Sequence, residues 1–543
     1  MIPSEQITEQ IARLSDALAA PLRRLRGPWG QALVIVALAA VCLGLIARQK
    51  TTTPFAYLLL FVFTVGIILL RRDRAAAVLC VALLLWVDWY GLIKVNSVIP
   101  LTLPTLGFFL AARGLEGRIY LRPREWVPWA RLPQWWLWAL VLLLGVLAFA
   151  HSPARTDAAY YFLTVLCLAP LFWALGTQVA RTTADLRALL NMLTVIGVIV
   201  ALHSIVESAA HVFLFETQGH RADVFMHGFF TLVTGSTKVI RASSFLGNPD
   251  SDGPFLAVMA CCALGLLVTA RAWPARLLAA AETLTIVIAL LFTYTAAAWI
   301  AFGCALVVFL ALATRGLRRL YLFGGVAAAG LAGYVIFRTD FAALFEHAKG
   351  PNELSLRMEI WDTAVHLIRA HPLFGIGLGL GAPYERVAAP VARALHDQLD
   401  SHPHNVFLEL AALAGIPLLL AFLAVLALTI RRVLLYYLRA TWEERALFAA
   451  VLAAVTVMCV DGLADRTWTL PPIAAIGWLI LSAAAAPALG ASLVRASGHA
   501  AGRAALPAPP LPSMTVSASG LGSAEPLGAI RRSDERIPDD IHD

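Results

Sequence analysis

The chain has 543 residues, of which 60% are hydrophobic and only 14% are charged, and its mean hydropathy is +0.76. A soluble domain carries about 25% charged residues, so this composition excludes a water-soluble globular protein. The formal net charge of +8 does not indicate nucleic-acid binding. The basic residues form short clusters between apolar runs, which is a pattern of membrane topology.

Long apolar runs recur along most of the chain, and each is close to the ~20 residues that a membrane-spanning helix needs. Helices are expected because the backbone must satisfy its own hydrogen bonds in lipid. We therefore predict an all-α, polytopic transmembrane bundle of about 14 spans. The predicted spans are about 29–47, 54–70, 75–92, 97–112, 133–150, 158–179, 187–209, 253–270, 276–293, 295–313, 319–337, 405–429, 444–462 and 469–486.

The basic residues predict the orientation of these spans. With the N-terminus inside, 28 of the 42 Lys and Arg residues fall on the cytoplasmic side, and each short inside segment is richer in them than its short outside neighbours. This is the distribution that the positive-inside rule requires. We expect a multi-pass protein of the inner membrane with both ends in the cytoplasm.

The chain divides into three predicted regions. Residues 1–28 carry apolar residues at helical spacing among arginines, which predicts an amphipathic helix on the cytoplasmic membrane surface or an ordinary basic N-terminus. Residues 29–486 form the transmembrane domain. Residues 487–543 are rich in Ala, Pro, Gly and Ser, which predicts a disordered cytoplasmic tail.

Two predicted external segments are long, about 210–252 and 338–404. Loops of this length in a compact protein are usually functional or disordered. The second contains an apolar stripe at helical spacing between Leu356 and Ile368, and Pro372 follows it. We expect an amphipathic helix that lies on the external membrane surface.

The first candidate site segment is Arg241–Asp252, a polar stretch rich in turn-forming residues directly before a span. It contains Arg241 and Asn248. The alternative interpretation is a capping turn beside a snorkelling arginine.

The second candidate segment joins Arg357 and Trp361 on the loop helix to the glycine-rich stretch His371–Gly379. The glycines resemble a phosphate-binding loop only superficially, because no Lys-Ser or Lys-Thr follows them. Glycines that allow a sharp turn and a close backbone approach are the simpler explanation.

The third candidate segment is Ser401-His402-Pro403-His404-Asn405, which ends where the external loop enters a span. A histidine with an ordinary pKa near 6.5 suits a general base. The alternatives are two surface histidines, or a metal site formed by His396, His402 and His404. A metal site would need Asp, Glu or Cys partners that the sequence does not indicate.

These three segments lie on the same predicted side of the membrane and suggest one reaction. Two guanidinium groups can chelate a diphosphate through charge-assisted hydrogen bonds. One imidazole can accept the proton of an attacking hydroxyl. Transfer of a glycan from a lipid diphosphate needs both functions and no nucleotide, because the diphosphate is the leaving group.

The same motifs resemble the O-antigen ligase and O-antigen polymerase superfamily. The resemblance covers about residues 190–430 and rests on Arg241 to Pro249, Leu356 to Trp361, Pro372 to Gly379, and His404-Asn405 followed by Ala414-Gly415-Ile416-Pro417. The sequence differs at Asp250, where relatives often have Asn, and at Thr293–Ala298, which lacks a common Arg.

The resemblance implies roles for six residues. Arg241 and Arg357 would bind an undecaprenyl diphosphate-linked glycan, and His404 would activate the acceptor hydroxyl. Asn248, Asn405 and Trp361 would complete the substrate site. The resemblance implies no metal and no other cofactor. The acceptor would be another glycan or a lipid A-core, and membrane lipids would surround the protein.

Two questions stay open from the sequence. The enzyme could be a ligase, which moves a finished glycan to an acceptor, or a polymerase, which joins repeat units. The alternative from another class is a transporter or flippase of polysaccharides or lipid-linked sugars. Such proteins place ionisable residues near the bilayer midplane, and here the spans are almost free of charge.

Overall fold

The structure is a computed structural model that describes residues 134–210, 231–234, 237–315, 353–397 and 399–504, with a few residues of 77–106 and 324–325. The chain separates into two compact units, Met1–Ser497 and Gly498–Asp543. The predicted amphipathic segment 1–28, most of the spans at 29–112 and 319–337, and the end of the tail lie outside the described residues.

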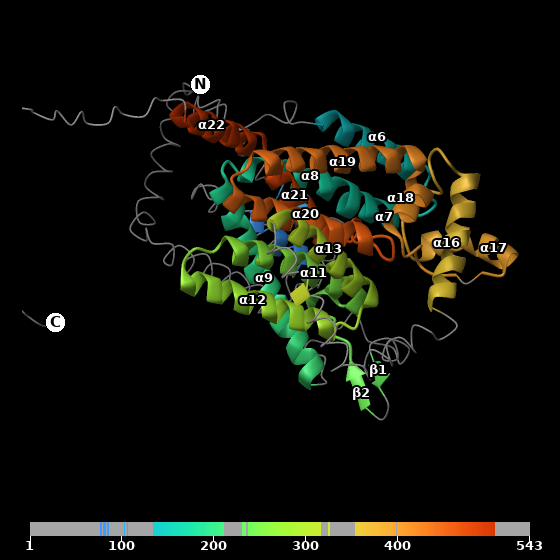
Figure 1. Cartoon of the computed structure of the whole chain (residues 1–543). Helices are drawn as coiled ribbons and strands as arrows, with labels where there is room; N and C mark the ends of the chain where they lie inside the picture. The colour runs from blue at the N-terminus through green and yellow to red at the C-terminus, as the bar shows by residue number, and fades with distance from the viewer. Residues whose placement is uncertain are drawn as a thin grey trace, which may run out of the picture. The chain divides into compact units, whose positions relative to one another are not determined.

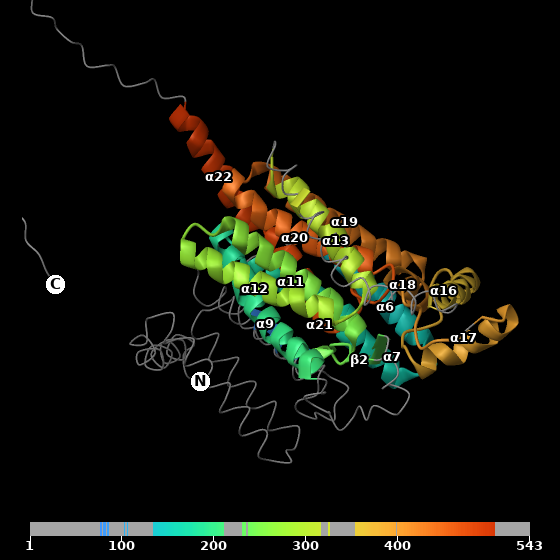
Figure 2. The ribbon, with the colours of Figure 1, turned by 60° about the horizontal axis from the view of Figure 1, so that its bottom comes forward.

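The described chain is almost entirely helical (Figures 1 and 2). The helices before the first long loop are α6 (Trp135–His151), α7 (Arg155–Tyr161), the π-helical segment η3 (Phe162–Cys167), α8 (Leu168–Val179) and α9 (Thr183–Ala210). Those between the long loops are α11 (Pro249–Thr269), α12 (Trp273–Phe292) and α13 (Ala296–Ala313). The remainder are α16 (Glu353–Ala370), α17 (Ala382–Leu395), α18 (Val406–Ala414), α19 (Ile416–Arg439), α20 (Trp442–Asp461), α21 (Pro471–Ala484) and α22 (Pro487–Ala504).

Seven helical segments in the described ranges are long and apolar enough to cross a membrane. They are Arg155–Val179, Thr183–Ala210, Pro249–Thr269, Trp273–Phe292, Ala296–Ala313, Ile416–Arg439 and Pro471–Arg495. The apolar helix α6 is shorter. The prediction of a helical membrane protein is therefore confirmed, whereas the count of 14 spans extends into residues outside the described ranges.

The predicted single span at 405–429 is wrong in detail, because the chain breaks between α18 and α19. Gly415 has a φ of 87°, a positive value that glycine adopts without a steric penalty. Pro417 follows in the first turn of α19, where its missing N–H costs nothing. The amide of Ile416 donates to the carbonyl of Pro372, 2.8 Å away, so the external loop occupies the break.

Two other segments differ from the predicted secondary structure. Residues Pro487–Ala504, assigned to a disordered tail, form helix α22. A short antiparallel hairpin, β1 (Thr231–Thr234) and β2 (Thr237–Ile240), stands in the first long loop with Thr231 opposite Ile240. Alternation over four residues is too short a pattern for a sequence to reveal a strand.

The predicted amphipathic helix of the second loop is present as α16. It buries Ile360, Ala364 and Leu367 on one face and packs against α17 and α18. Figure 1 shows α16 at one end of the bundle, running across the direction of α19, whereas Figure 2 views it almost end-on. This placement carries Arg357 to the end of the bundle where α18 begins.

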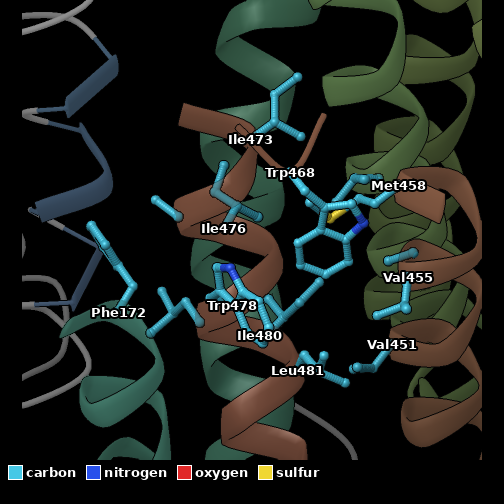
Figure 3. Close-up of a cluster of buried hydrophobic side chains, with 14 of the residues drawn as sticks. Phe172, Val451, Val455, Met458, Trp468, Ile473, Ile476, Trp478, Ile480 and Leu481 are labelled. Atoms are coloured by element: carbon cyan, nitrogen blue, oxygen red, sulfur yellow. The ribbon is translucent and has the colours of Figure 1, made fainter. Parts of the chain in front are cut away.

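A cluster of tryptophans fixes the turn between α20 and α21. The ring of Trp478 on α21 lies 4.9 Å from that of Trp138 and 5.0 Å from that of Trp468, centroid to centroid. All three side chains are fully buried, and Figure 3 shows Trp468 and Trp478 among aliphatic neighbours. Large buried aromatic rings contribute several kcal/mol each. The turn at 462–470, which carries Trp468, is therefore held firmly against the bundle.

Candidate active site

The segment that carries Arg241 is held by a buried carboxylate of α9. Glu207 accepts hydrogen bonds from the backbone amides of Ser243 and Ser244 at 3.3 and 2.9 Å. Asp252 of α11 accepts from the hydroxyls of Ser204 and Ser244, each at 2.6 Å. Two acidic groups that would be costly in lipid are thus satisfied by the loop that they position.

Arg241 lies where α11 begins and where α12 turns into α13. Its Nη2 atom is 2.7 Å from a carboxylate oxygen of Asp250, and it also donates to the Thr295 hydroxyl at 3.2 Å. Its Nε–H donates to the carbonyl of Thr293 at 3.1 Å. Arg241 is 8% exposed. A guanidinium so enclosed is rigidly aimed, and Asp250 offsets much of its charge.

The two predicted substrate-binding asparagines are helix caps. The side-chain oxygen of Asn248 accepts from the amide of Asp250 at 2.8 Å and begins α11. That of Asn405 accepts from the amides of Phe407 and Leu408 at 3.0 and 3.1 Å and begins α18. Asn405 also donates to the carbonyl of Leu463 at 3.0 Å. Both residues orient the chain next to Arg241 and His404, and their oxygens are already used.

Arg357 projects from α16 onto the turn between α20 and α21. Its Nη1 atom donates to the carbonyl oxygen of Ala464 at 3.0 Å. This acceptor is uncharged, so the positive charge of Arg357 is not offset at this contact. Trp361, one turn further along α16, is half-buried, and its indole N–H finds no hydrogen-bond partner within the described part of the chain.

The glycine-rich stretch joins α16 to the break between α18 and α19. Gly375 and Gly377 have φ values of 65° and 100°. The amides of Ile376 and Gly377 donate to the carbonyls of Ala412 and Leu413 at 2.9 and 3.1 Å. An added Cβ at Gly375 would collide with the backbone at Leu413. These glycines therefore allow two backbones to meet, in agreement with the simpler interpretation of the sequence.

His404 lies between two carboxylates just before α18. Its Nε2 atom is 3.1 Å from Oδ2 of Asp400, a hydrogen-bond distance. Its Nδ1 atom is 3.9 Å from Oδ1 of Asp465, which is too long for a direct bond. Its φ is 46°, in the left-handed region that histidine visits more often than most residues. The imidazole is thus oriented through Nε2, and Nδ1 remains for another partner.

The surroundings shift the pKa values of His404 and His402 in opposite directions. Burial opposes the charged form of His404, but the hydrogen bond with Asp400 and the charges of Asp465 and Asp400 outweigh it and raise its pKa. Burial, followed by the positive charges of His404 and Arg466, lowers the pKa of His402 well below its ordinary value. Burial favours the neutral form of Asp400, but His404 and His402 reverse this and lower its pKa. Asp400 is therefore a carboxylate partner for His404.

The turn at 462–470 connects these segments and was missed by the sequence interpretation. Burial and the negative charge of Asp250 raise the pKa of Asp465 to about 6, while His404, Arg466 and Arg357 act in the opposite direction. Asp465 therefore interacts electrostatically with charged groups from all three predicted segments. Its signal in the sequence was weak: a polar Asp461–Arg466 stretch between two apolar runs, on the side assigned as external.

Arg466 of the same turn is anchored inside the bundle. Its Nε atom is 3.1 Å from Oε2 of Glu409 on α18. Glu409 is fully buried, and its other oxygen accepts from the hydroxyl of Tyr161 at 2.8 Å. This ion pair connects the turn to α18. The turn carries Asp465, and His404 directly precedes α18, so the pair holds the segments of both residues together.

The structure thus brings Arg357 and His404 to one turn: Arg357 donates to Ala464, and His404 lies 3.9 Å from Asp465. It places Arg241 with Asp250, whose charge reaches Asp465. Among the described residues, the histidines of the loop form one cluster of potential metal ligands, Asp400, His402 and His404. His396 caps the end of α17 and is not part of it.

Comparison with known proteins supports the sequence interpretation. No curated protein matches the chain. Residues 281–423 match the family model described as O-antigen ligase. The matched range includes Arg357, His404 and Asn405, and it excludes Arg241. The predicted superfamily resemblance is confirmed over these residues, in a chain whose described part contains helices long and apolar enough to cross a membrane.

Proposed function

We propose that this protein is a glycosyltransferase of the bacterial inner membrane. It transfers a glycan from an undecaprenyl diphosphate donor to a hydroxyl acceptor on the periplasmic face. The observation that carries this proposal is His404, oriented by Asp400 and bordered by Asp465, with Arg357 of α16 hydrogen-bonded to Ala464 beside Asp465. This arrangement joins a general base to a cation that can receive a diphosphate.

The reaction proceeds by attack of the acceptor oxygen on the anomeric carbon of the donor. The bond from that carbon to the diphosphate oxygen breaks, and undecaprenyl diphosphate leaves with the electron pair. His404 Nδ1 accepts the hydroxyl proton, while Asp400 holds the opposite ring nitrogen and stabilises the imidazolium. The anomeric carbon is inverted, because a single displacement occurs. No metal or nucleotide takes part.

The two arginines stabilise the leaving diphosphate to different degrees. Arg357 offers a guanidinium with an uncharged protein acceptor, which suits a bidentate contact to phosphate oxygens. Arg241 is anchored by Asp250 and Thr293, so it orients one side of the site and adds less net charge. Trp361 lies one turn from Arg357 and supplies an indole N–H near the same end of α16.

The transporter alternative receives less support from the buried acids. In the described spans, Glu207 and Asp252 are fully buried, but they lie at helix ends and hold the Ser243–Ser244 backbone and hydroxyls. Groups used in this way position a loop. A transport pathway would instead place ionisable residues along the interior near the midplane.

The test compares His404→Ala and Arg357→Ala with two matched variants of α16, His366→Ala and Arg369→Ala. His366 bonds to the carbonyl of its own helix at Asp362, and Arg369 is exposed. Each variant replaces the native protein in the producing cell, and membrane abundance and surface polysaccharide are measured. The two site variants are expected to abolish the polymer at normal abundance, whereas the matched variants retain it.

Normal polysaccharide in both site variants would overturn the proposal. The type of residual product distinguishes the two reactions. A polymerase defect leaves single units attached to the acceptor, whereas a ligase defect accumulates unattached lipid-linked glycan. If these variants failed to export the lipid-linked sugar but still transferred glycan, the result would favour the transporter.

A further inference from the structure

Asp400, His402 and His404 bring three potential metal ligands together on one short loop. One ligand atom from each residue lies within 4.8 Å of the others. The three residues alternate along Asp400-Ser401-His402-Pro403-His404, and the imidazole centroids are 4.0 Å apart. Each is partly buried, so the group differs from the exposed acidic clusters that are common on protein surfaces.

The donor atoms select a particular class of ion. Two imidazole nitrogens and one carboxylate oxygen are ligands that Zn²⁺ accepts, and zinc sites with three protein ligands keep a fourth position open. Magnesium and calcium prefer oxygen donors throughout, so a pair of histidines disfavours them. The loop offers no cysteine, which leaves an N₂O set.

The neighbouring groups complete the site in two ways. Oδ1 of Asp465 is 4.0 Å from Nε2 of His402 and 3.9 Å from Nδ1 of His404. This second carboxylate can orient the histidines or fill the fourth position after a small movement. The hydroxyl of Ser401 lies 2.9 Å from Nδ1 of His402 and fixes that ring.

Two carboxylates near the loop balance the charges of two arginines. Arg357 and Arg466 oppose a cation here, since both disfavour the charged form of His402. The carboxylates of Asp400 and Asp465 face the same imidazoles and offset these two charges.

We propose that Asp400, His402 and His404 bind Zn²⁺ and that the bound ion inhibits the transfer reaction. The inhibition follows from the identity of the ligands. A zinc ion on Nδ1 of His404 would occupy the nitrogen that accepts the proton, and one on Nε2 would displace Asp400 from it. The binding site stands on the loop geometry alone, whereas the inhibition rests on the proposed function.

The binding test uses the full chain, purified with an affinity tag that contains no histidine. Zinc and magnesium are titrated separately by calorimetry, and Co²⁺ provides a visible spectrum that reports its geometry. We expect one zinc per protein and no magnesium binding. His402→Ala removes one ligand, so affinity should fall at least about tenfold. His366→Ala, which alters another partly exposed histidine beside a carboxylate, should bind zinc as the native protein does.

No zinc binding by the native chain, or unchanged binding by His402→Ala, would overturn the site. Equal losses in His402→Ala and His366→Ala would show adventitious binding to surface histidines and would also overturn it.

The inhibition test measures transfer with and without zinc, each protein being compared with its own metal-free rate. Zinc should suppress the native enzyme and lose this effect in His402→Ala. An unchanged or raised rate with the site filled would overturn the inhibition. A native protein that transfers no glycan without metal would refute the proposed function, while the binding isotherms would still decide the site.

Discussion

Arg241 and Arg357 are two guanidinium groups of one end of the bundle with different surroundings. Arg241 is 8% exposed and paired with Asp250 at 2.7 Å. Arg357 is half-buried and donates to a carbonyl of the 462–470 turn. Breaking a buried ion pair leaves an uncompensated charge, which is costlier than losing a half-buried cation that bonds only to a carbonyl. Two residues of the same type, predicted for the same role, thus have different contacts: Arg241 is enclosed by protein partners, and the proposed function makes Arg357 the group that binds the substrate.

The largest expected effect is on catalysis and belongs to Arg357. Arg357→Ala should lower the transfer rate about 100-fold, because it removes a donor aimed at the leaving diphosphate. The melting temperature should hardly change, since only one hydrogen bond to a backbone carbonyl is lost. Rates and melting curves of protein in lipid discs measure both quantities. Arg357→Lys should recover only part of the rate, because an ammonium cannot make a bidentate contact.

A large fall in the melting temperature of Arg357→Ala would show that Arg357, like Arg241, stabilises the fold, and the two arginines would no longer differ in role. Arg369→Ala, on the same helix, provides the control for a general effect on α16.

The next effect is on stability and belongs to Arg241. Arg241→Ala leaves the Asp250 carboxylate without its cation, at a cost of about 3 kcal/mol. The double variant Arg241→Ala, Asp250→Ala should be less destabilised than Arg241→Ala alone, because no buried charge remains. Thermal unfolding and membrane abundance of the single and double variants test this. A double variant at least as unstable as Arg241→Ala would show that the ion pair is not the anchor.

A smaller effect concerns pH. As the base, His404 must be neutral, so the transfer rate should rise with pH through its raised pKa. Asp400→Asn removes the charge that favours the imidazolium. The pKa of His404 should fall, and the acidic limb of kcat/KM should move to lower pH. The maximum rate should also drop, because Asp400 orients the ring.

The pH profiles of the native enzyme and Asp400→Asn measure this shift directly. Asp362→Asn, next to His366 on α16, is the matched control. An acidic limb that stays in place in Asp400→Asn would assign it to another group.

The helices were predictable because their signals are local. Apolar runs predict most helices of the described bundle, and the apolar stripe from Leu356 to Ile368 predicts α16. The break at Gly415 was not predicted, although Gly-Ile-Pro is visible there, since an apolar run continues on both sides. What ends α18 is a contact with the glycine-rich loop some 40 residues earlier, which a one-dimensional pattern does not contain.

The partners of the site residues were less predictable for the same reason. His404 and Arg357 were found by motif, but Asp465 is about 60 residues from His404 in sequence. Its importance comes from the tryptophan cluster that holds the 462–470 turn in place. Asp400 lies only four residues from His404, so this partner could have been found from the local spacing of the sequence.

The smallest expected effect separates the two asparagine caps. Asn248→Ala and Asn405→Ala should each lose about 1 kcal/mol of stability through an uncapped helix. Asn405→Ala should lose more, because the bond to the Leu463 carbonyl is lost as well. It should also lower the rate, since that bond holds the His404 loop against the 462–470 turn. Thermal unfolding with donor-dependent kinetics tests both statements. A raised KM for the donor at an unchanged melting temperature would instead make these asparagines direct substrate contacts. Asn248 and its neighbour Arg241 would then both belong to the substrate-binding site.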